Sequence, residues 1–104
     1  MQLNPECKPY FHNWVQLSGF ENNNDTWTAP CDGFISIVLN QNVSTTEYAY
    51  IFDGALGMYA TTLVIPNGPQ GYAYSNSAPV QKNRQYTLQT NVSNVYITFM
   101  PYDV

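Results

Sequence analysis

Apolar and polar residues alternate over short stretches along most of the chain. In residues 95–99, Val95, Ile97 and Phe99 fall on one face and Tyr96 and Thr98 on the other. Residues 86–90 alternate in the same way. A period of two is typical of a strand with one buried face, so both segments are predicted as β-strands. The short polar stretch 91–94 between them favours a hairpin connection.

Further strands are predicted on both sides of the middle of the chain. Residues 34–39 are apolar on both faces, which predicts a central strand of a sheet. Residues 48–52 and 58–65 are β-branched and aromatic runs, and the turn residues between them predict a second hairpin. Residues 67–71 are rich in Gly and Pro and break the chain before a short strand at 72–74.

The whole pattern predicts an all-β fold, an antiparallel β-sandwich of seven to eight short strands. No segment carries apolar residues at helical spacing over three turns, and 104 residues are enough for one domain. We expect residues 1–20 to form an extended N-terminal arm and the first strand, and residues 21–104 to form the sandwich. Trp27 and Phe34 are expected in the core, together with the inward positions of the alternating strands, Ile35, Ile37, Leu39, Leu88, Val95, Ile97 and Phe99.

The charge of the chain excludes several partners. Seven acidic and three basic residues give a net charge of −4, and no basic stripe is present to contact a phosphate backbone, so no nucleic acid is expected. No apolar run approaches the roughly 20 residues that cross a bilayer. The N-terminus also lacks the basic and apolar regions of a signal peptide. We therefore expect no membrane insertion and no export by that route.

The two cysteines leave an alternative open. Cys7 and Cys31 could close a disulfide loop worth about 3 kcal/mol in the chain-entropy model. Two free thiols are equally compatible with the residues, and the missing signal peptide favours them.

Residues that could carry chemistry are few and dispersed. His12 is the only histidine, and with Cys7 and Cys31 it matches no known metal-ligand spacing or nucleophile arrangement. The carboxylates that glycoside hydrolysis would use include Asp32 and Asp53, but each precedes a glycine and so indicates a tight turn. The sequence predicts no enzyme activity, no metal and no cofactor.

Aromatic residues are in surplus, with nine Tyr and two Trp. Their rings give broad, rigid contact area with a polar tip, which suits sugar stacking and protein interfaces. We predict that Asp53, Tyr72 and Tyr74 bind a ligand, because the loops 53–57 and 67–74 are expected at one end of the domain. Outward strand positions are predicted to form an oligomer interface, with Tyr48, Tyr50, Tyr96 and Tyr102 as contributors.

Three stretches resemble a known family. Residues 26–35 contain W-T-A-P-C-D-G-F-I and resemble the entry segment W-T-A-P-x-D-G-[YF]-[IV] of small jelly-roll domains in bacteriophage fibres and related virion appendages. Residues 78–87 resemble the family's turn and strand P-V-x-K-G-x-x-[YV]-T, with Asn83 in place of the usual Gly. Asn is the next best residue at positive φ. Residues 98–102 resemble its closing F-x-P-[YL].

The resemblance implies a jelly roll like the complement-type and tumour-necrosis-factor-like sandwiches, which are usually trimers at a fibre tip or on a capsid. We therefore expect a homotrimeric virion structural protein that is made in the host cytoplasm and recognises a bacterial surface glycan or protein. Residues 2–14 would attach it to other virion proteins. One alternative is a capsid decoration or head-fibre protein for virion assembly, and another is a free carbohydrate-binding module.

Overall fold

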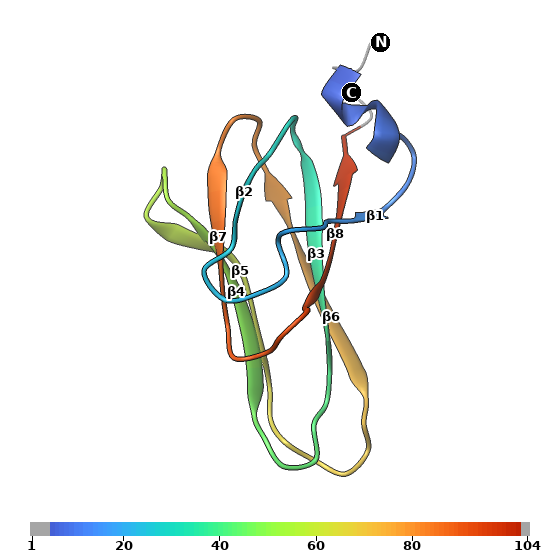
Figure 1. Cartoon of the computed structure of the whole chain (residues 1–104), viewed down its shortest axis with the longest axis vertical. Helices are drawn as coiled ribbons and strands as arrows, with labels where there is room; N and C mark the ends of the chain where they lie inside the picture. Colours follow the sequence, from blue (N-terminus) through green and yellow to red (C-terminus); the bar gives the residue numbers. More distant parts are fainter. Residues whose placement is uncertain (1–4, 103–104) are drawn as a thin grey trace.

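Eight strands follow one short helix along residues 5–102, the part of the chain that the computed structural model describes (Figure 1). The helix is a 3-10 helix, and the strands fill most of the remaining chain. Their bounds are η1 Pro5–Tyr10, β1 Val15–Gln16, β2 Thr26–Thr28, β3 Gly33–Asn40, β4 Glu47–Asp53, β5 Met58–Ile65, β6 Ala73–Val80, β7 Gln85–Thr90 and β8 Tyr96–Pro101.

The strands form two four-stranded sheets that pack face to face. Sheet 1 has the order β1-β8-β3-β6, sheet 2 has the order β2-β7-β4-β5, and all neighbours are antiparallel. β1 pairs with β8, β2 with β7, β3 with β6 and β4 with β5, and successive pairs alternate between the two sheets. This nested order is that of a jelly roll. The predicted all-β antiparallel sandwich is confirmed.

The core lies between the sheets and follows from the period of two. The register places Ile37 opposite Ile97 in sheet 1 and Ile51 opposite Leu88 in sheet 2. Every inward residue that the alternation predicts is buried, with at most 3% exposed. Trp27 also packs against this core, with its ring centroid 5.0 Å from that of Phe99.

Two local predictions are wrong. β7 pairs with β2 and β4, whereas β8 pairs with β1 and β3, so residues 91–95 cross between sheets instead of closing a hairpin. A short polar connection has the same composition in both cases, and only pairing across the fold decides between them. Phe34 alternates with the inward Ile35 and therefore faces outward, 36% exposed, with its ring edge-on to Tyr102 at 4.6 Å.

The N-terminal segment is packed against the sandwich, and it differs from the extended arm that the sequence predicts. Cys7 lies in η1, is completely buried, and forms a disulfide with Cys31, just before β3. The ring of Tyr10 meets that of Phe99 edge-on at 5.0 Å. β1 pairs with β8, so the first strand belongs to sheet 1. Residues 2–4 of the expected arm lie outside the described residues.

Gly33 at the start of β3 is required by close packing. A Cβ at this position would overlap the carbonyl oxygen of Met100 and lie 2.6 Å from the ring of Phe99. The chain bends at residues 30–32, and Gly33 already pairs with Val80 and Pro101. The turn that the sequence places at Asp32-Gly33 therefore comes just before the glycine.

Candidate functional site

The three residues predicted to bind a ligand do not lie at one end of the domain. Asp53 ends β4, where the hairpin turn leads into β5. β5 then runs to the other end, where Tyr72 precedes β6 and Tyr74 pairs with Leu39. Figure 1 shows the tip of the β4–β5 hairpin and the loop before β6 well separated. Both tyrosines are exposed, whereas Asp53 is 4% exposed.

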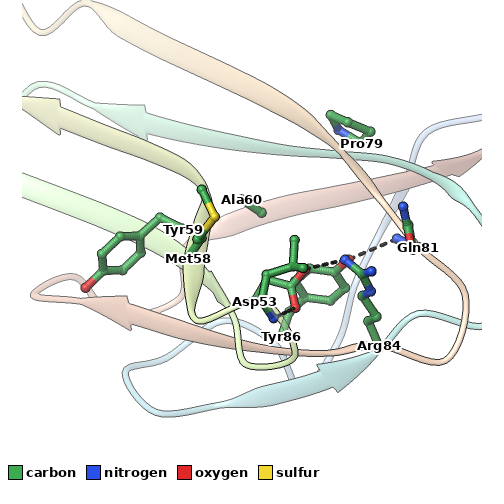
Figure 2. A pocket seen from close by; sticks show the side chains of 9 residues that line it. Asp53, Met58, Tyr59, Ala60, Pro79, Gln81, Arg84 and Tyr86 are labelled. Carbon is green, nitrogen blue, oxygen red and sulfur yellow. Dashed lines mark hydrogen bonds and ion pairs between the residues drawn. The ribbon is translucent and has the colours of Figure 1, made fainter.

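Asp53 lies in a hollow of about 250 Å³ between the β4–β5 turn and the β6–β7 turn (Figure 2). Its Oδ2 forms an ion pair with Arg84 at 3.0 Å, and its Oδ1 accepts a hydrogen bond from the Ala55 N–H at 3.0 Å. Beside it, the Tyr86 oxygen accepts the Gln81 N–H at 2.9 Å. Burial raises the pKa of the Tyr86 phenol above its ordinary value.

These contacts favour a structural role for Asp53. Both of its carboxylate oxygens are engaged within the protein, one capping the 54–57 turn and the other holding the cation that precedes β7. Figure 2 shows the Tyr59 ring pointing away from this ion pair. The hollow therefore joins two turns at the end of the sandwich. That Asp53 binds a ligand directly stays a prediction.

A row of aromatic rings covers the outer face of sheet 2. The register puts Tyr48, Tyr50 and Phe52 of β4 on this face, with Tyr59 of β5 opposite Phe52. We call these four residues the aromatic row. Ring centroids are 5.0 Å apart for Tyr48 and Tyr50, 5.4 Å for Tyr50 and Tyr59, and 5.3 Å for Phe52 and Tyr59. Tyr59 is 49% exposed, and the other three are half-buried because the rings partly cover one another.

Uncharged hydrogen-bonding side chains frame the aromatic row. The Tyr59 hydroxyl donates to Gln89 Oε1 at 3.0 Å, which fixes the ring against β7. By register, the neighbouring outward positions on β2, β5 and β7 are Thr26, Thr28, Thr62, Val64, Gln85, Thr87 and Gln89, and all except Val64, which is exposed opposite Tyr48, carry a hydrogen-bonding side chain. No charged residue occupies an outward position of sheet 2. The face can therefore offer apolar ring surface together with hydroxyl and amide groups.

The sequence pointed to part of the aromatic row and missed the rest. Tyr48 and Tyr50 were expected to face outward, and they do. Phe52 and Tyr59 were missed, although Phe52 continues the same alternation. Tyr59 could not be placed by alternation alone, because the register of the β4–β5 pair shifts between Ile51 and Phe52.

The four predicted interface tyrosines fall on two different surfaces. Tyr48 and Tyr50 lie on the outer face of sheet 2, whereas Tyr96 is on the outer face of sheet 1 opposite Val38, and Tyr102 packs against Phe34 beside that sheet. They do not form one continuous patch. Tyr96 also borders a second hollow of about 320 Å³ near the β7–β8 connection, which Asn40, Asn42, Glu47 and Asn94 help to line.

Within residues 5–102, no three His, Cys, Asp or Glu side chains gather closely enough to hold a metal ion. Across the same residues, no helix has the length and apolar character needed to span a membrane.

The three stretches that carry the family resemblance meet at one end of the sandwich. Asp32 Oδ1 accepts the Lys82 N–H at 2.8 Å, and the Asp32 carbonyl accepts the Tyr102 N–H at 3.0 Å. Ala29 also exchanges backbone hydrogen bonds with Asn83 and Arg84. Asn83 has a φ of 68°, the left-handed conformation that the family's glycine would adopt. Segments distant in sequence thus form one hydrogen-bonded cluster.

Searches of protein-family models and of curated proteins found no match to this chain.

Proposed function

We propose that the chain is a binding module of a bacteriophage virion, a trimeric fibre or spike tip that recognises a receptor on the bacterial surface and carries out no catalysis. The observation that carries this proposal is the cluster formed by residues 26–35, 78–87 and 98–102. The stretches that resemble phage jelly-roll domains are separated in the sequence, yet hydrogen bonds join them at one end of a jelly roll. The pairing of β3 with β6 and β8 brings the three stretches together, and the match between their turn residues and this arrangement supports the proposal.

The disulfide is consistent with a role outside the cell. Disulfides persist in oxidising surroundings and are rare in the reducing cytosol. A virion protein made in the cytoplasm meets such surroundings after release, and the buried bond between Cys7 and Cys31 would then fasten η1 to the sandwich. The exposed rings of Phe11 and Trp14, 41% and 45% exposed, follow η1 and are suited to contact another virion protein.

The proposal assigns the trimer contact to the side of sheet 1. A closed ring of three needs contact surfaces inclined towards each other, whereas opposite faces of one sandwich would propagate an open chain. The predicted tyrosines therefore cannot all serve one ring. Phe34, Tyr96 and Tyr102 form the set on sheet 1, and the aromatic row of sheet 2 then remains free for the receptor.

Two measurements test this proposal. Multi-angle light scattering should give three times the chain mass of 11.8 kDa, and Tyr96→Ala should lower this mass. Fluorescently labelled protein should adsorb to intact cells of some members of a bacterial panel, with the heat-unfolded chain as control. A chain that stays monomeric at every concentration and adsorbs to no cell type would contradict the proposal.

A further inference from the structure

The aromatic row forms a strip, and its area can be compared with the contact area that a protein partner needs. Tyr48 and Phe52 are four residues apart on β4, about 14 Å, and the row spans two neighbouring strands, about 10 Å. A stable protein interface buries about 800 Å² on each partner. By these spacings the strip has a flat footprint of only about 140 Å². The exposed Val64 lies beside Tyr48, and uncharged polar side chains of β7 and β2 border the other edge. A second protein is therefore a poor occupant.

The chemistry of the strip fits a sugar chain. A sugar ring has an apolar face of C–H groups and an edge of hydroxyls, so it can lie on aromatic rings while its hydroxyls bond to neighbouring side chains. Tyr50 and Tyr59 provide rings, and Thr62, Thr87 and Gln89 lie at the adjacent outward positions. Gln89 Oε1 already accepts from Tyr59, which leaves its amide N–H groups for a ligand.

The charge of the chain indicates that the polysaccharide bound by this face is neutral and not acidic. The outward positions of sheet 2 carry no charged side chain, and the chain has a net charge of −4. An acidic polysaccharide would meet repulsion and no cation on this face. A neutral polysaccharide loses no charge solvation there and keeps its hydrogen bonds.

We propose that the outer face of sheet 2 binds a linear neutral polysaccharide, with sugar rings lying on the exposed surface of the aromatic row, whose rings Tyr48 and Tyr50 are inclined by only 30°, and with Thr62, Thr87 and Gln89 bonded to the sugar hydroxyls. This inference rests on the proposed function and names the chemical class of its receptor. It places the ligand on a sheet face instead of on the loops at the ends of the sandwich.

Affinity gel electrophoresis of the full chain tests the proposal. The gels contain hydroxyethylcellulose, xylan, glucomannan or dextran as neutral polymers and alginate as the acidic one. We expect at least one neutral polymer, and not alginate, to retard the chain. Tyr59→Ala should raise the Kd about tenfold, equivalent to about 1.4 kcal/mol. Tyr59→Phe keeps the ring and should lose less, and Tyr74→Ala, an exposed tyrosine on β6, should bind as the wild type does.

The outcomes separate this inference from the proposed function. Absence of retardation by all four neutral polymers, or a correctly folded Tyr59→Ala that binds as the wild type, would overturn the inference. A Tyr59→Ala variant of lower mass in light scattering would also overturn it, because the strip would then be a self-contact. A trimer that adsorbs to cells yet ignores neutral polymers removes only this inference. A monomer that binds a neutral polymer through Tyr59 removes only the trimeric virion proposal.

Discussion

The two sheets share one core, but their outer faces differ. Sheet 1 presents small hydroxyl residues outward, Ser36, Ser75 and Ser77. Its outward rings are Phe34 of β3 and Tyr96 of β8, and Tyr96 lies opposite Val38 of β3. Phe34 and Val38 are four residues apart, so the two rings start about 14 Å from each other. Sheet 2 instead brings four rings into mutual contact. The inner faces form the core, and the contrast between the outer faces supports the ligand site that we propose on sheet 2.

The largest expected effect tests whether both sheets bury their inward residues in one shared core. Ile37 lies beneath sheet 1 and Ile51 beneath sheet 2, and both are fully buried. Ile37→Ala and Ile51→Ala should each lower the free energy of unfolding by about 2–5 kcal/mol, from lost apolar contact and a cavity. Urea unfolding followed by circular dichroism measures this. A loss below about 0.5 kcal/mol in either variant would mean that its sheet does not bury that residue.

Removal of the disulfide should lower the stability of the domain while sheet 2 keeps its ligand binding. It joins η1 to the start of β3 and so lies on the sheet 1 side. The double variant Cys7→Ser/Cys31→Ser should lose about 3 kcal/mol, because its unfolded chain is no longer restrained. Polysaccharide binding by sheet 2 should persist at temperatures where the variant is folded. Thermal melting with and without a reductant gives the stability, and an unchanged melting temperature would contradict the bond.

Substitution of Asp53 tests whether this residue has a structural role or contacts a ligand next to the aromatic row. Asp53→Asn removes the charge that pairs with Arg84 and should lower the free energy of unfolding by about 1–3 kcal/mol. Polymer retardation of the folded variant should stay at the wild-type level. Glu47→Gln at the opposite end of β4 serves as the control. Weaker binding at unchanged stability would restore Asp53 as the ligand contact that the sequence predicts.

The smallest expected effect is the loss of folding stability at alkaline pH that accompanies ionisation of Tyr86. Burial raises the Tyr86 pKa from its ordinary value of 10.0, so the unfolded chain releases this proton first as pH rises. Stability is therefore retained below pH 10 and declines through the folded pKa above it. Urea unfolding between pH 8 and about pH 11 should show a smaller decline for Tyr86→Phe. An equal decline in both proteins would assign the effect to other tyrosines.

The local alternation of apolar and polar residues predicted most of the strands and their inward positions, because a single buried face imposes a period of two on each strand. It placed Ile35, Ile37 and Ile97 correctly without knowledge of strand order. It failed at the β7–β8 connection, where pairing depends on strands distant in the sequence. The sequence analysis left the Cys7–Cys31 bond open and favoured free thiols, which is wrong, since the packing of η1 against the sandwich brings the two residues together.

The candidate site was harder to predict. Outward tyrosines could be recognised one at a time, but their neighbours depend on register. The shift between Ile51 and Phe52 places Tyr59 opposite Phe52, and no alternation within β5 contains that information. Grouping Asp53 with Tyr72 and Tyr74 failed for a related reason. Each of these residues lies near a loop or turn, but which end a loop occupies follows from the strand order.

The most direct measurement of the contrast between the two faces is a titration followed by NMR. The ligand is an oligosaccharide cut from the neutral polysaccharide that retards the chain most. Aromatic and backbone signals of Tyr48, Tyr50, Phe52 and Tyr59 should shift together with one Kd, while those of Tyr96 and Tyr74 should stay in place. Shifts centred on Tyr96, Tyr72 or Tyr74, with the aromatic row unmoved, would contradict the account.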